Sequence, residues 1–278
     1  MWQSVKAFFF LICLALAVAA GALWYRHTHH HVYTPPPPRP EVTITIIPGW
    51  DLRQVADYFV SLGFASTTAD VYRVTGQPAL QSSAATYSIS SSTSADLGFK
   101  LPQHISLEGY LAPETYRVYA SSSIQMIVEK LLEQRASELG NLSVTSSDLS
   151  VNNLLTLASI VEKEAKTEVD RKLVADILLR RLKAGMPLEL DSTVSYAVDR
   201  TGTVYTTAKD RAVDSPWNTY KYAGLPPGPI CNPSVASIEA VLHPTPNAYW
   251  YFLSGMDGEM HYAKTLAEHN LNVVRYLK

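Results

Sequence analysis

Residues 154–165 read LLTLASIVEKEA, and this stretch decides the fold of the larger part of the chain. Apolar residues recur every three or four positions, which predicts an amphipathic helix over about residues 152–165. One face of this helix is entirely apolar, so we expect it to pack against a core. The apolar face carries Leu154, Leu157, Ala158, Val161 and Ala165, and the opposite face, predicted to meet water, carries Thr156, Ser159 and Lys163.

Two glutamates near the end of this helix point to different sides of it. At about 100° per residue, Glu164 falls between Leu157 and Ile160, inside the apolar arc, whereas Glu162 falls at the other margin. A carboxyl group among aliphatic side chains loses hydration, which favours its protonated form and suits a general acid. The alternative is that Glu164 is a structural residue paired with a neighbouring Lys or Arg.

Helical patterns continue on both sides of this segment. An apolar stripe predicts a helix that begins near Ile124 and ends near Gly140, and Thr167 with Asp170 resembles a capping box for another helix. Residues 108–278 are therefore predicted to form a mainly helical α+β domain with a small sheet. Its later elements are expected to be a short helix at 234–242, a hairpin pairing 249–253 with 260–263, and a terminal helix at 266–277.

A small α/β domain is predicted over residues 42–107. Residues 42–47 read VTITII, which is typical of a strand, and a Pro-Gly turn follows them. Asp51 is then placed to cap an amphipathic helix. Residues 81–96 are rich in Ser, Thr and Ala and have little to bury, so we expect a flexible surface loop there.

The N-terminal residues 1–26 predict a transmembrane anchor. No charged residue interrupts the apolar run from Ala7 to Tyr25. At about 1.5 Å per residue, a helix of this length spans a hydrocarbon core of roughly 30 Å. Residues 17–19 read AVA, so a cleaved signal peptide is the alternative. Either possibility exports the rest of the chain.

Residues 27–41 predict an extended linker that is rich in His and Pro. No Cys, Asp or Glu is interleaved with its histidines, so a solvated segment is favoured over a metal site and no metal ligand is assigned. Cys231 is the one cysteine of the exported part, which rules out a disulfide within it. The linker histidines are His27, His29, His30 and His31.

The overall charge excludes one class of partner. The chain has 23 basic and 25 acidic residues. A nucleic-acid partner requires a basic stripe that neutralises phosphates, and this balance offers none. We therefore expect no nucleic-acid binding.

Seven separated segments carry a resemblance to a known family. They are EGYLAPETY at 108–116, ASIVEKE at 158–164, LDSTV at 190–194, NTY at 218–220, GLPPGPI at 224–230, HP at 243–244 and EHN at 268–270. In this order they resemble the YceG-like family of endolytic murein transglycosylases, and the similarity extends from about Ile44 to the C-terminus. The resemblance implies a lysozyme-like catalytic domain at 108–278 and a LysM-like fold for the small domain.

The resemblance also implies a reaction. The family cleaves the β-1,4 bond between N-acetylmuramic acid and N-acetylglucosamine, and its catalytic glutamate maps to Glu164, with Glu162 as the second candidate. Glu164 would protonate the leaving oxygen and then deprotonate the muramyl 6-hydroxyl, whose attack leaves a 1,6-anhydro end. Because this nucleophile is intramolecular, neither a second carboxylate nor a cofactor is required. Relatives often carry a hydroxyl residue after this glutamate, where the present chain has Ala165.

Four further residues are predicted substrate contacts. Asp191 would contact sugar or position Glu164, unless it caps the following helix. Asn218 and Tyr220 flank a Pro/Gly-rich loop and would line a sugar cleft, unless they only anchor that loop. His261, on the predicted hairpin, would reach the cleft, unless its role is structural.

The expected protein is an endolytic lytic transglycosylase of nascent peptidoglycan. We expect a single-pass protein of the cell inner (cytoplasmic) membrane, with its catalytic domain on the periplasmic or extracellular side. Its expected partners are peptidoglycan glycan strands and penicillin-binding synthases of the elongation or division complex. Two alternatives stay open: a muramidase that hydrolyses the same bond with water positioned by Asp191, and a catalytically silent glycan-binding scaffold.

Overall fold

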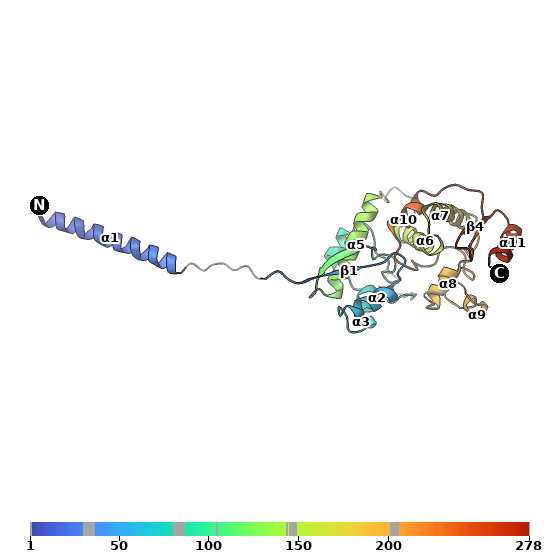
Figure 1. Ribbon diagram of the computed structural model, residues 1–278, viewed down its shortest axis with the longest axis horizontal. Coiled ribbons are helices and arrows are strands. Elements are labelled where there is room, and N and C mark those ends of the chain that lie inside the picture. The colour runs from blue at the N-terminus through green and yellow to red at the C-terminus, as the bar shows by residue number, and fades with distance from the viewer. Residues whose placement is uncertain are drawn as a thin grey trace. The chain divides into compact units, whose positions relative to one another are not determined.

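The computed structural model describes residues 2–29, 37–79, 87–103, 105–142, 144, 149–200 and 206–277. The chain divides into two compact units, Met1–Arg39 and Pro40–Lys278. The first contains one long helix, and the second contains the other described helices together with two small antiparallel sheets (Figure 1). This mixture confirms the predicted α+β class.

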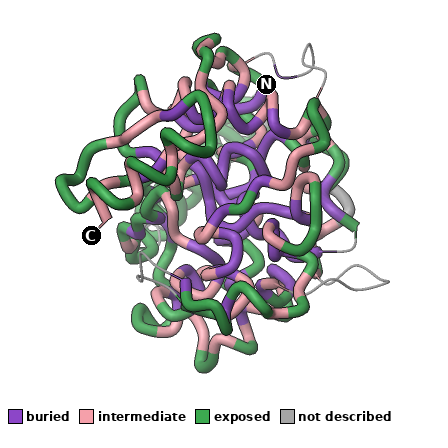
Figure 2. Tube along the Cα trace, turned by 90° about the vertical axis from the view of Figure 1, so that its right-hand side faces the viewer, coloured by how far each residue is buried: buried purple, intermediate pink, exposed green. Residues whose placement is uncertain are grey.

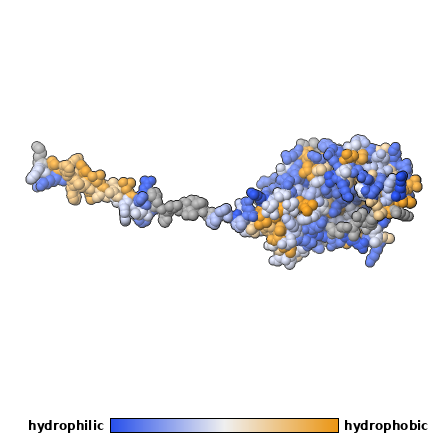
Figure 3. Space-filling view, viewed as in Figure 1, coloured by the Kyte–Doolittle hydropathy of each residue, from blue (hydrophilic) through white to orange (hydrophobic). Residues whose placement is uncertain are grey.

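The first unit is dominated by helix α1 (Trp2–Thr28), whose surface is largely apolar (Figure 3). Among the described residues, it is the one helix long and apolar enough to cross a membrane, over Val5–Thr28 with a mean hydropathy of 2.5. The apolar segment predicted over residues 1–26 is therefore present as a continuous helix.

The linker predicted over residues 27–41 is described only in part. His27 belongs to the last turn of α1, and the His29 ring stacks on Tyr25 at 4.1 Å between centroids. His30 and His31 lie outside the described residues, as do residues 32–36. Within the part that is described, no group of three or more His, Cys, Asp or Glu side chains is arranged to hold a metal ion.

Helix α6 (Val151–Glu164) is a largely buried helix of the second unit and packs against α7 (Glu168–Lys183) and α10 (Val235–Leu242). Its residues from Leu154 to Val161 are all buried, and Figure 2 shows how buried residues gather inside this unit. These helices and α5 (Ile124–Asn141) confirm the elements predicted from apolar periodicity.

The prediction that Thr156 and Ser159 face water is wrong. Both residues are fully buried, and the Pro-rich loop that contains Ile230 lies against Ser159. The Ile230 backbone N–H donates to Ser159 Oγ at 3.0 Å. Lys163 is exposed, as predicted. The Thr156 and Ser159 hydroxyls thus bond to backbone carbonyls and do not contact solvent, whereas Lys163 does.

Two strands join distant parts of the sequence. Strand β1 (Glu41–Thr45) pairs antiparallel with β2 (Thr115–Tyr119), a strand that the sequence analysis did not predict. The pair connects residues on either side of the boundary predicted between residues 107 and 108, and that boundary stays a prediction. Asp51 caps α2 (Leu52–Ser61) in a capping box with Gln54, which confirms its predicted role.

The Ser-rich stretch is helical where a loop was predicted. Residues 91–96 form the short helix α4 (Ser91–Asp96), and the Ser90 hydroxyl accepts a hydrogen bond from the Thr93 backbone N–H at 3.3 Å. Leu97 is buried directly after it and anchors the helix to the core. Residues 81–86, the first part of the predicted loop, lie outside the described residues.

The remaining elements complete the second unit. The predicted hairpin is present, with its turn at Asp257 and Gly258, and a terminal helix follows it. A short helix begins at Asp191, in the segment that carries several predicted site residues. These elements are α3 (Thr68–Thr75), α8 (Asp191–Ala197), α9 (Ala208–Arg211), β3 (Tyr251–Ser254), β4 (Met260–Ala263) and α11 (Leu266–Tyr276).

Candidate functional site

Glu164 is the last residue of α6, and the chain leaves the helix directly after it. Ala165 adopts extended backbone angles (φ −131°, ψ 135°) and is buried. Glu164 itself is partly exposed, but the surrounding protein atoms dehydrate its carboxyl and raise its pKa above the ordinary value. The hydroxyl and backbone N–H of Ser192 face the carboxyl and lower this pKa, and the charge of Asp191 raises it. The net effect favours the protonated form.

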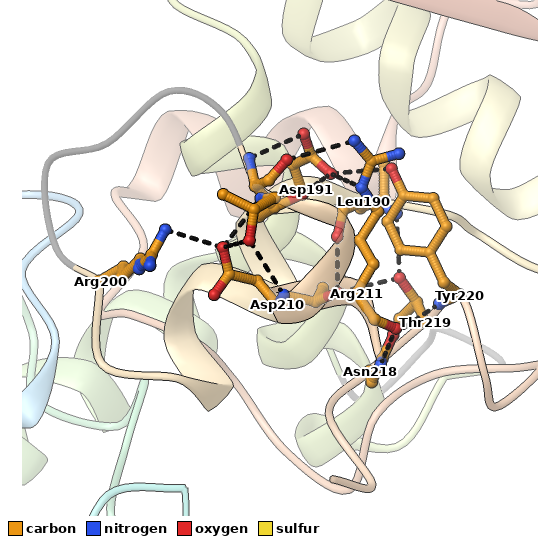
Figure 4. A network of polar contacts seen from close by, with 11 residues as sticks. Leu190, Asp191, Arg200, Asp210, Arg211, Asn218, Thr219 and Tyr220 are labelled. Atoms are coloured by element: carbon orange, nitrogen blue, oxygen red, sulfur yellow. Dashed lines mark hydrogen bonds and ion pairs between the residues drawn. The ribbon is translucent and has the colours of Figure 1, made fainter. Parts of the chain in front are cut away.

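The Asp191 carboxylate, whose charge acts on Glu164, lies in a network of polar contacts that includes Tyr220 and Arg211 (Figure 4). Tyr220 Oη donates to Asp191 Oδ1 at 2.8 Å, and Thr206 Oγ1 donates to the same oxygen at 2.5 Å. Arg211 Nε lies 3.9 Å from this oxygen. Asp191 is the first residue of α8 and its side chain does not cap that helix. Two hydroxyl donors and one nearby guanidinium from elsewhere in the chain therefore fix its orientation.

The Tyr220 phenol connects this network to Glu164. Burial raises the pKa of Tyr220, and the carboxylates of Asp191 and Glu164 raise it further. The phenol therefore stays protonated and acts as a donor at neutral pH. The Arg211 guanidinium lies 5.4 Å from the centre of the Tyr220 ring, so one aromatic face is already covered.

Asn218 holds the loop that carries Tyr220. Its side chain is fully buried, and its Nδ2 donates to the carbonyl oxygens of Arg211 at 3.0 Å and Val213 at 2.8 Å. Its Oδ1 accepts from the Tyr220 backbone N–H at 3.1 Å. With these groups engaged, the placement favours the loop-anchoring role over direct contact with sugar.

Thr219, between these two residues, fixes the start of α8. Its Oγ1 accepts from the Leu190 backbone N–H at 3.0 Å and lies 2.9 Å from Thr193 Oγ1. The Glu189 backbone N–H donates to the Thr219 carbonyl at 3.2 Å. The loop at residues 218–220 thus positions Asp191 through the backbone as well as through the Tyr220 phenol.

Glu162 lies apart from this network and binds the start of α10. Its Oε2 accepts from the Ser234 backbone N–H at 3.0 Å, from Ser234 Oγ at 2.5 Å and from Ser237 Oγ at 2.6 Å. Arg171 lies 3.5 Å from the other oxygen, and the Glu162 side chain is only 7% exposed. A carboxylate enclosed in this way has little freedom to meet a substrate.

His261 is held within its own hairpin. Its Nε2 lies 2.9 Å from Asp257 Oδ2, and its ring stacks on Tyr276 at 3.4 Å between centroids. Among the described residues, no hydrogen bond or ion pair joins it to Glu164 or Asp191. Its role as a substrate contact stays a prediction.

Several residues of the network were missed by sequence reasoning. Thr206 and Arg211 bond or approach Asp191 from a segment with no recognisable pattern, so no signal marked them. Ser192 and Thr219 stand inside two of the segments quoted above and were available from that resemblance.

Glu108, in the first of those segments, is a second carboxyl that the sequence analysis did not single out. It is 1% exposed. Both of its oxygens accept from the Leu52 backbone N–H, at 3.1 and 3.0 Å, and Tyr196 Oη donates to Oε2 at 3.1 Å. Burial, and then the charge of Asp51, raise the pKa of Glu108 to about 8. Because it is sealed inside the protein, we assign it a structural role.

The arrangement around Glu164 supports proton transfer to a bound ligand. A carboxyl whose pKa is raised, and which is partly open to solvent, can deliver a proton to a substrate oxygen. The charge of Asp191 also acts on Glu164, and this carboxylate is held in place by two hydroxyl donors and by the nearby Arg211 guanidinium. Two surface hollows of the second unit lie elsewhere, one beside Leu97 and Glu133 and one beside Arg53 and Tyr72.

The chain is similar to known proteins of one family. A profile of the YceG-like family matches residues 27–275. An endolytic murein transglycosylase of Bacillus subtilis (strain 168) is 42% identical over 176 residues, which is 62% of this chain and 48% of that protein. The corresponding protein of Streptococcus pneumoniae (serotype 2, strain D39) is 38% identical over 179 residues, 62% of this chain and 32% of that protein.

A solved structure is also similar. The crystal structure of a YceG-like protein from Listeria monocytogenes superposes with a TM-score of 0.69 at 35% identity, covering 83% of this chain and 75% of that one. The present chain spans about half of the Bacillus protein's length and a third of the Streptococcus protein's length in these matches.

Proposed function

The chain belongs to the YceG-like family, and from this premise we propose that it is an endolytic lytic transglycosylase that cleaves peptidoglycan glycan strands. Both curated relatives named above are endolytic murein transglycosylases. The observation that carries the proposal is the Glu164 carboxyl, whose pKa is raised by burial and which stays partly exposed at the end of α6. An acid of this kind is what protonation of a glycosidic oxygen requires.

In the proposed reaction, Glu164 acts twice. As an acid, it transfers its proton to the oxygen that leaves with N-acetylglucosamine while the bond from that oxygen to the muramyl anomeric carbon breaks. As a carboxylate, it then takes the proton of the muramyl 6-hydroxyl, whose oxygen bonds to the anomeric carbon and closes a 1,6-anhydro ring. The proton lost in the first step is regained in the second, so the residue ends as it began and no water is consumed.

Asp191 is proposed to assist this cycle and to contact the sugar, together with Tyr220. From its position beside Glu164, the negative carboxylate of Asp191 would stabilise the positive charge that develops on the anomeric carbon. A hydrolase would instead need a carboxylate free to activate water. Tyr220 and Thr206 already donate to one oxygen of Asp191, which favours the stabilising role over the activation of water.

The finer fold and location are part of the proposal. We infer a lysozyme-like catalytic domain at residues 108–278 and a LysM-like domain at 42–107, supported by the family. The apolar helix α1 supports attachment to the cytoplasmic membrane by a single span, with the second unit on the side where peptidoglycan is built. Penicillin-binding synthases are proposed as partners because a membrane-held enzyme meets the strands that they release.

The products of cleavage test the proposal. The full chain, purified in detergent, is incubated with uncrosslinked glycan strands and the products are analysed by mass spectrometry. We expect fragments that end in 1,6-anhydro-N-acetylmuramic acid, formed by cuts inside the strand. Reducing muramyl ends, which weigh one water more, would identify a muramidase, and intact strands that remain bound to the chain would identify a glycan-binding scaffold.

A further inference from the structure

Ser192 has a buried hydroxyl for which the described residues offer no hydrogen bond of standard geometry. It is the second residue of α8, next to Asp191 in sequence. Its Oγ is buried and lacks a hydrogen-bond partner, although the residue as a whole keeps some exposure. Buried hydroxyls are almost always paired in folded proteins, so an unpaired one needs an explanation.

This hydroxyl faces the Glu164 carboxyl. Helices α6 and α8 pack on each other, and the Ser192 hydroxyl and backbone N–H are the two groups that favour the ionised form of Glu164. A serine O–H turns about its C–O bond toward an acceptor, so this hydroxyl can donate to the carboxyl.

The other donors near Glu164 are already used or missing. Tyr220 Oη and Thr206 Oγ1 both donate to Asp191. Ala165, the residue directly after Glu164, is buried and presents only a methyl group. Ser192 is a side-chain donor that faces Glu164 and has no other hydrogen bond among the residues described.

We propose that Ser192 is a positioning residue for Glu164, and that its hydroxyl orients the acid and binds the carboxylate that remains after proton delivery. This inference rests on the proposed function. When Glu164 gives up its proton, a negative charge appears beside Asp191 in a partly dehydrated site. A hydroxyl donor that costs no reorganisation stabilises that charge and so lowers the barrier to proton delivery.

The test compares rate profiles of the full chain and its variants in detergent, on uncrosslinked glycan. Ser192→Ala is expected to lower kcat about tenfold, the effect of losing one hydrogen bond to a charged group, with little change in KM. Because the carboxylate loses a donor, the pKa of Glu164 rises, and the alkaline limb of the rate profile moves to higher pH. Ser192→Thr keeps the hydroxyl and is expected to keep the limb in place.

A matched control separates this effect from damage to α8. Ser195→Ala removes a hydroxyl one turn further along the same helix and is expected to leave kcat and the pH profile unchanged. Should Ser192→Ala unfold, Ser192→Cys supplies a weaker donor of similar shape and is expected to move the limb in the same direction.

Two results would overturn the inference. One is a Ser192→Ala variant with the wild-type kcat and alkaline limb, and the other is a change confined to KM, which would make Ser192 a sugar contact. If the unmodified chain releases no fragments at all, the proposed function fails, and this outcome is distinct from an active chain that is indifferent to Ser192.

Discussion

The Tyr220 hydroxyl donates to Asp191 Oδ1 across 2.8 Å, and this bond ties the loop at residues 218–220 to the first turn of α8. The charge of Glu164 also raises the pKa of this phenol. One tyrosine thus connects the two carboxyl groups on which the proposed chemistry depends.

Replacing Tyr220 by Phe removes this donor and keeps the ring. Asp191 then keeps Thr206 and Arg211 as partners but loses its direct link to the loop, so we expect kcat to fall about tenfold while the protein stays folded. The matched control is Tyr222→Phe, because the Tyr222 hydroxyl donates to Asp214 on the exposed surface. Steady-state kinetics measure the kcat of both variants. A Tyr220→Phe variant with the same kcat as Tyr222→Phe would contradict the prediction.

Glu162 is expected to contribute to stability and not to catalysis. Glu162→Ala removes an acceptor of three hydrogen bonds at the start of α10 and leaves Arg171 without its carboxylate. We expect the free energy of unfolding to fall by about 2–3 kcal/mol. Glu168→Ala, which removes an exposed partner of Lys172, is expected to change it very little.

Denaturant titrations measure this difference. At a temperature where Glu162→Ala remains folded, the variant is expected to retain most of the wild-type kcat. A folded Glu162→Ala variant without activity would indicate that Glu162 is the catalytic residue.

The raised pKa of Glu108 is expected to make the stability of the protein depend on pH. Its pKa is about 8 in the folded protein and about 4.3 in an unfolded chain. A raised pKa means that the folded state binds the proton more tightly than the unfolded chain does. The contribution of Glu108 to the free energy of unfolding is therefore complete below the pKa of the unfolded chain and is lost as the pH rises to about 8. We therefore expect the Tm to fall between pH 5 and pH 8.

The variant Glu108→Gln removes the titrating group and is expected to flatten the pH dependence of the Tm. The control Glu133→Gln, at an exposed position of α5, is expected to leave the pH dependence of the Tm unchanged. Thermal unfolding at several pH values makes the comparison. A Glu108→Gln profile as steep as that of the wild type would assign the pH dependence to other groups.

The sequence predicted the helices and the position of Glu164 because both follow from short-range spacing. Periodic apolar residues define α6, and the wheel that places Glu164 among them depends only on residues within two turns. The buried state of Ser159 did not follow, because it arises from contact with Ile230, which lies far along the chain. A polar residue that bonds a distant backbone looks the same in sequence as one that faces water.

The residues around Asp191 could not be predicted either, because they also lie far from it in the sequence. Its two hydroxyl donors, Tyr220 and Thr206, come from separate loops, and only the first stood in a recognised segment. Strand β2 was missed because its pairing with β1 is a long-range event, whereas its local sequence, TYRVY, gives only a five-residue signal.

The most direct test of the central claim is the rate of glycan cleavage by Glu164→Gln. Glutamine keeps the shape of the side chain but cannot transfer a proton, so we predict a loss of kcat of about a thousandfold with an unchanged Tm. The companion variant Glu162→Gln is predicted to remain active. A fully active Glu164→Gln protein beside an inactive, folded Glu162→Gln protein would show that Glu164 is not the acid.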